Sequence, residues 1–166
     1  MAHTDVVSAH SSAFTGTHTD QFLHVFSFGP YTNAAPMPLY TNGTYNLMTI
    51  PFKCSIEKIT VRCKTKSADN SDTEHISFYV GASGTAPATA ISGTIDVYTL
   101  TDATAFDIPL TTINGTASTA HKNLQAGTAL AIKTEGTIST LAELMIEVVV
   151  RREPFHTADS GNVIQG

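Results

Sequence analysis

Histidine is the residue of this chain best suited to metal binding, and it is concentrated near the N-terminus. Seven histidines occur in 166 residues, and the first four are His3, His10, His18 and His24. A preformed zinc site needs ligands at close spacing, commonly with cysteines among them. The four lack both features. We interpret them as part of a polar arm rich in His and Thr, with a site assembled from several subunits around a symmetry axis as the alternative.

The other three histidines show no pattern of nucleophilic catalysis. His75 precedes a predicted strand, His121 lies in a predicted loop, and His156 lies in the C-terminal tail. A Ser/His/Asp hydrolase of the Gly-x-Ser-x-Gly type presents its serine on a strained turn, and the sequence lacks that motif. We predict that these are surface histidines.

Carboxylates near the last predicted strand could serve as an acid and base pair. Glu143, Glu147 and Glu153 recur at even spacing on its polar face, and a glycosidase needs only two carboxylates. We favour a solvated or interface-facing strand edge as the simpler interpretation.

A short acidic loop offers the oxygen ligands that calcium prefers. It contains Asp69, Asn70, Asp72 and Glu74. The spacing is not that of an EF-hand, and the glycine of that loop is missing, so we predict a solvated loop.

Glycines at 81–84 and 115 lack the lysine and the strand-to-helix context of a phosphate loop, and we predict turns there. The motif search therefore assigns no catalytic, cofactor-binding or metal-binding residue, and we expect that the protein is not an enzyme.

The two cysteines, Cys54 and Cys63, could form at most one disulfide. Their odd separation within one extended run would put the side chains on opposite faces, and no disulfide framework is present. We predict buried free thiols.

The charge pattern argues against nucleic acid and membranes as partners. Charged residues make up 14% of the chain, the net charge is -5, and Arg151–Arg152 are the only adjacent cations. Counterion release on nucleic acid needs several clustered cations. No apolar run approaches the roughly 20 residues of a membrane span, and residues 1–7 lack the features of a secretory signal. We expect a soluble protein made in a cytosol.

Short apolar–polar alternations separated by turn residues predict an all-β fold. We expect an antiparallel β-sandwich, jelly-roll-like, of about eight strands with an extended N-terminal arm. An immunoglobulin-type domain is the rival, but the missing Trp and the close Cys pair disfavour it. The expected strands lie within 23–28, 45–52, 54–64, 76–80, 95–98, 106–110, 129–135 and 144–151.

The same pattern divides the chain into three parts. Residues 1–22 are polar without apolar periodicity and read as an N-terminal arm, 23–152 form the β domain, and 153–166 form a C-terminal tail.

Period-two alternation also assigns the faces of the strands. The phase of Cys54 and Ile56 is opposite to that of Ile59, which predicts a bulge or tight turn near Glu57. The residues expected in the core are Ile59, Val61, Cys63, Ile76, Phe78, Val80, Leu144, Ile146, Val148 and Val150.

Three segments carry a resemblance to a known group of proteins: Ile50–Cys63, Leu124–Lys133 and the closing run Leu144–Arg152. Together they resemble the small jelly-roll structural proteins of tailed bacteriophages, namely capsid decoration or cement proteins and fibre head domains. The likeness covers about residues 45 to 152.

The resemblance implies a virion structural protein, most of all a cement protein that binds and stabilises the phage head as a homotrimer. The implied partners are further copies of the chain and the major capsid protein. The implied location is the capsid surface, after synthesis in the host cytoplasm.

The competing function is a carbohydrate- or receptor-binding head of a tail fibre, because jelly rolls also present loop aromatics that stack on sugars. The aromatics outside the clearest core strands are Tyr31, Tyr40, Tyr45 and Phe155. An enzyme is the third possibility.

Overall fold

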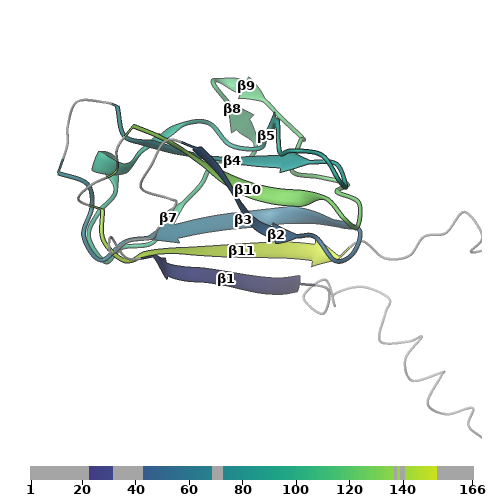
Figure 1. The fold of residues 1–166 in the computed structure, drawn as a ribbon, viewed down its shortest axis with the longest axis horizontal. Helices are drawn as coiled ribbons and strands as arrows, with labels where there is room; N and C mark the ends of the chain where they lie inside the picture. The colour runs from purple at the N-terminus through teal and green to yellow at the C-terminus, as the bar shows by residue number, and fades with distance from the viewer. Residues whose placement is uncertain (1–22, 32–42, 69–72, 137, 139–140, 153–166) are drawn as a thin grey trace, which may run out of the picture.

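Two antiparallel β-sheets packed face to face form the protein in the computed structural model (Figure 1). The structure describes residues 23–31, 43–68, 73–136, 138 and 141–152. The expected arm 1–22 and the tail 153–166 lie outside this part of the chain. The long strands are β1 (Leu23–Tyr31), β2 (Gly43–Thr49), β3 (Cys54–Arg62), β4 (His75–Gly81), β10 (Ala129–Glu135) and β11 (Leu144–Arg152). The short ones are β5 (Thr89–Ala90), β6 (Ile95–Asp96), β7 (Phe106–Asp107), β8 (Thr112–Ile113) and β9 (Thr116–Ala117).

The strand order is that of a jelly roll. Sheet A has the order β1-β11-β3-β7, and sheet B has the order β2-β10-β4-β5, with β6 also paired to β4. Strand β11 lies between β1 and β3, and β10 lies between β2 and β4, so the last two long strands insert between the first four. The first four long strands alternate between the sheets, and β10 and β11 then return to sheets B and A, as in the double Greek key of a jelly roll. The predicted all-β sandwich is confirmed.

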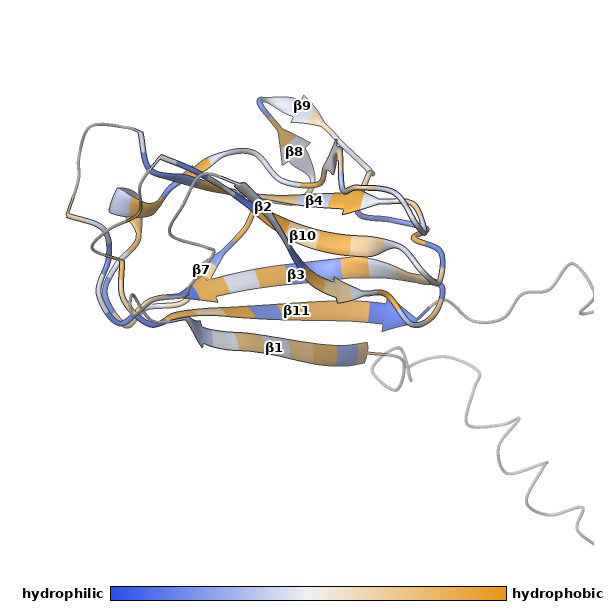
Figure 2. Ribbon diagram, viewed as in Figure 1, coloured by the Kyte–Doolittle hydropathy of each residue, from blue (hydrophilic) through white to orange (hydrophobic). Residues whose placement is uncertain are grey.

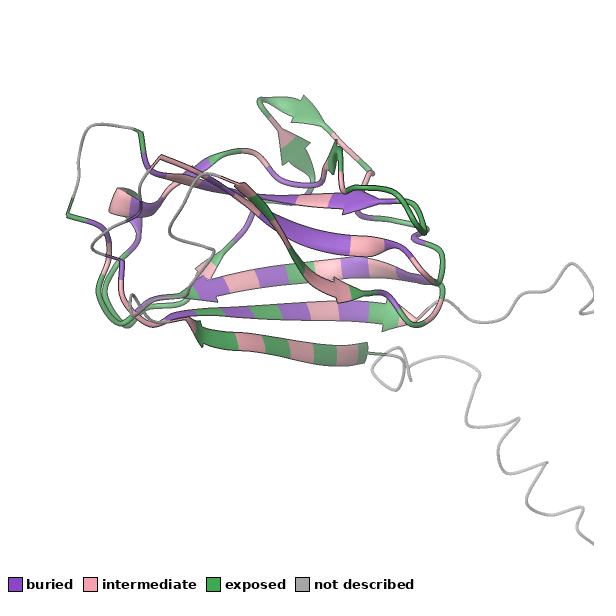
Figure 3. Cartoon of the chain, in the orientation of Figure 1, coloured by how far each residue is buried: buried purple, intermediate pink, exposed green. Residues whose placement is uncertain are grey.

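The core fills the space between the sheets. Alternate residues of β3, β4, β10 and β11 are buried there, whereas β1 has no fully buried residue (Figure 3). Hydrophobic positions alternate with hydrophilic ones along β3 (Figure 2). All ten residues predicted for the core are buried. The period-two argument therefore places the faces of β3, β4 and β11 correctly.

The predicted irregularity near Glu57 is a β-bulge. Lys58 is opposite Val149 and Ile56 is opposite Val150, so Glu57 is the extra residue on β3. Because a bulge shifts the alternation by one position, Cys54 and Ile56 face the same core as Ile59. This explains how two cysteines at an odd separation both become buried.

Two expected strands are shorter than predicted. The segment 95–98 contains only β6, because the carboxylate of Asp96 accepts a hydrogen bond from the Tyr98 amide at 2.8 Å and starts a single 3-10 turn, η3 (Val97–Thr99). Strand β7 ends before Pro109, although the Ile108 amide still donates to the Ile59 carbonyl at 2.8 Å. A proline nitrogen cannot continue the ladder.

The turn predicted at 114–115 closes a small hairpin that was not expected as a pair of strands. Asn114 and Gly115 both have positive φ, 48° and 79°, as a two-residue hairpin turn requires. The strands that it joins, β8 and β9, pair only with each other in the described structure.

Candidate interaction surface

The outer face of sheet A carries apolar side chains in solvent. In the described part of the chain the exposed large hydrophobic residues are Leu23, Val25 and Met145, with exposed fractions of 37%, 57% and 45%. All three have the outward parity of β1 and β11, since their neighbours Phe26 and Ile146 point inward. No other face of the described structure has this property.

Cross-strand register brings part of this apolar surface together. Val25 of β1 lies opposite Val149 of β11, and Leu23 lies opposite Arg151. Directly paired side chains on one face of a sheet are about 4.5–5.5 Å apart at Cβ. Leu23, Val25 and Val149 therefore form one contiguous cluster, which we call the β1–β11 patch.

Two ion pairs flank the patch on its β3 side. Lys58 contacts Asp107 at 3.0 Å, Arg151 contacts Glu57 at 3.2 Å, and the hydrogen bond from Lys58 lowers the pKa of the Asp107 carboxyl. Exposed pairs of this kind contribute little to stability. Apolar side chains with polar groups beside them are, however, a usual feature of protein–protein interfaces.

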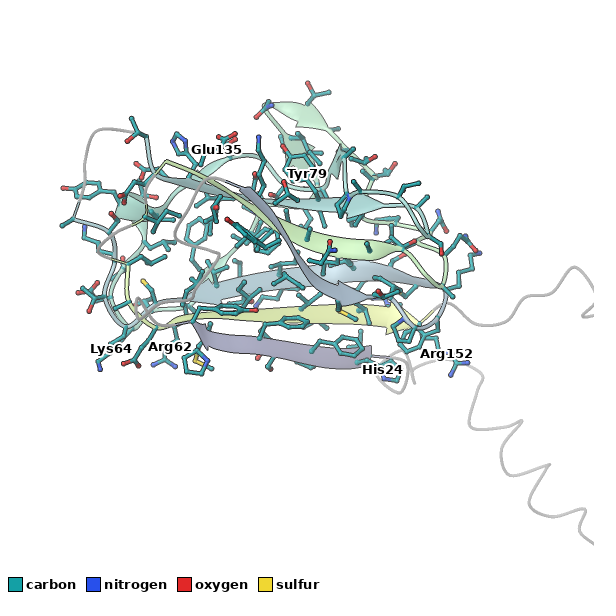
Figure 4. The ribbon with its side chains drawn as sticks, in the orientation of Figure 1. His24, Arg62, Lys64, Tyr79, Glu135 and Arg152 are labelled. Atoms are coloured by element: carbon teal, nitrogen blue, oxygen red, sulfur yellow. The ribbon has the colours of Figure 1, made fainter. Side chains whose placement is uncertain are left out.

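A hollow of about 310 Å³ lies at the end of sheet A away from the start of β1. Its lining includes Arg62, Lys64, Glu143 and Met145, and Figure 4 shows Arg62 and Lys64 side by side there. Lys64 is bonded to Glu143 at 2.7 Å, whereas Arg62 has no ion-pair partner among the described residues.

The outer face of sheet B differs from that of sheet A. The Lys133 ammonium on this face is paired within the same sheet. It contacts the Glu135 carboxylate at 2.5 Å and lies 5.8 Å from the centre of the Tyr79 ring. Small side chains at Ser77 and Ala131 are buried between these larger ones. This face is polar and its charges are paired (Figure 4 labels Tyr79 and Glu135).

The structure corrects the prediction for His121, which is buried with 3% of its surface exposed. The segment that contains it is hydrogen-bonded to β3, with the Ile56 amide donating to the His121 carbonyl at 2.9 Å. Burial, and next the positive charge of Lys122, lower the pKa of the His121 ring. Its Nδ1 atom has no hydrogen-bond partner in the described structure.

The remaining histidines do not come together. His75 is the first residue of β4 and its Nδ1 lies 3.9 Å from a Glu135 carboxylate oxygen. His24 lies on β1 with its ring centre 4.7 Å from that of Phe52, and Arg152 lies over the same Phe52 ring. His3, His10, His18 and His156 lie outside the described residues.

The predicted solvated acidic loop also needs a correction. Glu74 is buried, with 2% of its surface exposed, and accepts a hydrogen bond from the Ser67 hydroxyl, itself buried. Asp69, Asn70 and Asp72 lie outside the described residues. Within the part that is described, no group of three or more His, Cys, Asp or Glu side chains could hold a metal ion.

The three glutamates proposed for the last strand do not share one site. Glu143 precedes β11 with φ of 51° and binds Lys64, and Glu147 is exposed on the outer face of sheet A. Glu153 is outside the described residues. No acid and base pair is assembled from them in the described structure.

Both cysteines are buried free thiols, as predicted. Burial raises the pKa of the Cys63 thiol, and the nearby charge of Asp102 acts in the same direction. A thiol held in its protonated form is a poor nucleophile. Cys54 and Cys63 are therefore core residues.

A second hollow, of about 400 Å³, lies beside β6, η3 and β7 and is lined by Thr94, Asp96, Thr99, Phe106 and other residues. The aromatics that we considered for sugar stacking lie elsewhere. Tyr31 and Tyr45 are half-buried against the core, and Tyr40 and Phe155 lie outside the described residues.

Among the described residues, no helix is long and apolar enough to cross a membrane.

No family model and no curated protein matches the sequence. Among solved structures, a chain from the acidic stable capsid structure of Helicobacter pylori bacteriophage KHP30 is similar to this chain, with a TM-score of 0.44 and 14% sequence identity. The match covers 78% of this chain and 86% of that chain. The jelly-roll assignment rests on strand order alone.

Proposed function

We propose that this chain is a virion structural protein, and more specifically a capsid decoration (cement) protein that binds and stabilises a phage head as a homotrimer. Its partners are then further copies of itself and the major capsid protein. Its place is the capsid surface, after synthesis in the host cytoplasm. The role is non-enzymatic, since an added protein that buries surface across subunit boundaries stabilises the lattice by binding alone.

The β1–β11 patch is the observation that carries the proposal. Leu23 and Val25 are exposed on the outer face of sheet A, so they add little to the stability of the single chain, whose core is already filled by other residues. Burying such a patch in an assembly removes apolar area from water, and the ion pairs on its β3 side can face the partner's polar groups. The strand order agrees with the fold that the sequence resemblance implies.

The test is assembly and capsid binding by the full chain. We expect sedimentation equilibrium at micromolar concentration to give a trimer, and the protein to pellet with purified capsids from which it has been removed. Unexpanded and expanded capsids are compared, because a cement protein is expected to prefer the expanded lattice. A monomer that binds neither form would contradict the proposal.

Matched variants connect this function to the patch. Val25→Asp places a charge in the patch, and Thr44→Asp places the same charge at an exposed position of β2. We expect Val25→Asp to weaken assembly and capsid binding while Thr44→Asp leaves both unchanged, because only the first requires a carboxylate to be desolvated at an apolar contact. Equal effects of the two would mean that the patch is not the contact.

The second candidate, a carbohydrate- or receptor-binding head, has one observation in its favour. The hollow beside β7 combines the Phe106 ring with threonine hydroxyls and the Asp96 carboxylate, groups that can stack on and hydrogen-bond a sugar. Binding to immobilised glycans, lost in Phe106→Ala and accompanied by no capsid binding, would favour this function over the first.

A further inference from the structure

The hollow that contains Arg62, Lys64, Glu143 and Met145, which we call the Arg62 hollow, lies on the same face as the β1–β11 patch. Arg62 of β3 is opposite Met145 of β11, and both have the outward parity of sheet A. Met145 and Val149 are four residues apart on β11, which is about 13 Å along a strand. A partner that lies over the outer face of sheet A can therefore reach the patch and the hollow together.

Arg62 is the cation of this face that is free to bind a partner. Four cations have outward positions on β3 and β11 or just beyond β3: Lys58, Arg62, Lys64 and Arg151. The other three contact carboxylates at 3.0, 2.7 and 3.2 Å, whereas Arg62 has no ion pair with any described residue. Glu147 is diagonal to Arg62 across β3 and β11, yet the two are not bonded. The guanidinium therefore keeps its N–H donors available.

The backbone around the hollow is held in an unfavourable conformation. Four non-glycine residues of the described structure have positive φ, and two of them, Asn114 and Asn123, are of a type that adopts it readily. The other two, Ala103 (φ 56°) and Glu143 (φ 51°), both line the Arg62 hollow. Such positions cost free energy and are concentrated at ligand-binding sites. The fold thus fixes the wall of this hollow at a cost to its own stability.

The charges of the hollow favour a carboxylate over a phosphate. A guanidinium can bind either anion through two parallel hydrogen bonds. Lys64 is already bonded to Glu143 at 2.7 Å, so these two charges offset each other and Arg62 supplies the remaining positive charge. The Glu143 carboxylate would repel a second negative charge on the ligand. A singly charged carboxylate therefore fits, and the exposed Met145 side chain offers apolar contact to the methylene groups that carry it.

The position of the hollow favours a different protein as the source of this carboxylate. Arginine is enriched in protein–protein interfaces, where it binds beside apolar contacts. In the described structure the exposed large hydrophobic residues all lie on this one face. A second copy could therefore cover the β1–β11 patch with large apolar side chains only by presenting the same face. A different protein is not limited in this way.

We propose that the Arg62 hollow binds an aspartate or glutamate side chain of a partner protein, whose apolar side chains cover the β1–β11 patch about 13 Å away. The inference rests on the proposed function, in which this partner is the major capsid protein, and it names the chemistry of that contact. Arg62 forms the charge-assisted hydrogen bonds with the carboxylate. Lys64 and Glu143 hold the wall beside it and are positioning residues.

Two charge-removing variants of the full chain test the role of Arg62. Arg62→Gln removes the guanidinium, and Lys122→Gln removes an exposed cation near the other end of β3 that also lacks an ion pair within the described part of the chain. We expect Arg62→Gln to lower the affinity for purified expanded capsids about tenfold, as for a close charge pair across an interface. Lys122→Gln should leave it unchanged. Equal urea midpoints of both variants and the wild type would show that the fold is retained.

Salt provides a second readout, which a merely structural role of Arg62 would not change. Dissolved ions screen the attraction between a guanidinium and a carboxylate. We therefore expect the affinity of the wild type for capsids to decrease as salt is added. The decrease should be smaller in Arg62→Gln and unaltered in Lys122→Gln.

A cross-link identifies the group that Arg62 meets. Arg62→Lys keeps the positive charge and adds a primary amine, which a water-soluble carbodiimide joins to a neighbouring carboxylate as an amide. We expect mass spectrometry of the capsid-bound variant to find position 62 joined to an Asp or Glu of the capsid protein. The wild type, treated in the same way, should show no cross-link at this position, because a guanidinium does not form this amide.

The outcomes separate this proposal from the one it rests on. Equal capsid affinities of the wild type and Arg62→Gln would overturn the proposal and leave the cement function standing. Cross-links from position 62 only to this chain, in the same copy or a second one, would do the same. A wild-type chain that binds no capsid would contradict the cement function and this inference together.

Discussion

The interior of the sandwich and the outer face of sheet A are built from the same kinds of side chain in the same strands. On β11, Val148 is fully buried between the sheets while its neighbour Val149 lies on the outer face beside Val25. Hydropathy alone does not distinguish these valines; only the packing of the two sheets does. Apolar residues on the inside stabilise the single chain, whereas those on the outside are free to stabilise an assembly.

Removing a large side chain from the interior gives the largest expected effect. Phe78 of β4 is fully buried, and large-to-small substitution at such a site leaves a cavity as well as losing burial. We expect Phe78→Ala to lower the free energy of unfolding by about 3–5 kcal/mol in urea titrations. The outer-face control, Met145→Ala, is expected to change it by no more than about 0.5 kcal/mol. Similar losses in both variants would remove the distinction between the two regions.

The buried polar pair gives the next effect. Ser67 donates to the Glu74 carboxyl in a site that excludes water. Ser67→Ala removes a donor from a buried acceptor, which costs roughly 1–3 kcal/mol. We expect this loss in urea titrations at neutral pH. Ser83→Ala, at an exposed loop position, is the control. If both variants changed the free energy of unfolding equally, the hydrogen bond from Ser67 to Glu74 would not contribute to stability.

A smaller effect is expected from pH, through His121. Burial lowers the pKa of its ring below the ordinary value of 6.5. The folded chain therefore favours the neutral imidazole more than the unfolded chain does. The unfolded chain therefore binds more protons as the pH falls through 6.5, and stability decreases in that direction. Unfolding midpoints measured from pH 8 down to about pH 5 should fall less steeply in His121→Gln. An unchanged slope would mean that His121 does not titrate differently on folding.

Much of this architecture can be predicted from the sequence, because period-two alternation directly reflects which side of a sheet a residue faces. It locates the long strands, the faces of β3, β4 and β11, and the bulge at Glu57, where two alternating runs are out of phase. The signal is strong here because a register slip by one residue would bury Lys58 and Arg62 without partners.

The candidate surface has a weaker signal in the sequence. Both parities of β1 are apolar, with Leu23 and Val25 on one and Phe26 and Phe28 on the other. Such a run indicates a strand covered on two sides, yet the described structure covers only one. That mismatch between pattern and packing is what could have located the patch.

His121 and Glu74 could not be placed in the same way, because their burial depends on contacts distant in sequence. The polar segment 119–123 has no apolar period. Backbone hydrogen bonds hold it against β3, one from Ile56 to His121 within the segment and a pair between Cys54 and Leu124 directly after it. Glu74 likewise becomes buried through Ser67 and the Val97 amide, which donates to its carbonyl at 3.1 Å. Local composition predicts solvent exposure for both.

The smallest expected effect comes from Lys64, which has the outward parity just beyond the end of β3. Its ammonium is bonded to Glu143 at 2.7 Å, and this hydrogen bond raises the pKa of Lys64. Both side chains are exposed, so the solvent screens the pair and its contribution is small. We expect Lys64→Ala to leave the urea midpoint unchanged within error, at low and at high salt. Its neighbour Cys63 is buried. If Lys64→Ala lowered the free energy of unfolding as much as Phe78→Ala, the inner and outer faces at this end of sheet A would be reversed. The outward placement of Arg62 and Met145, which pair across β3 and β11, would then be wrong as well.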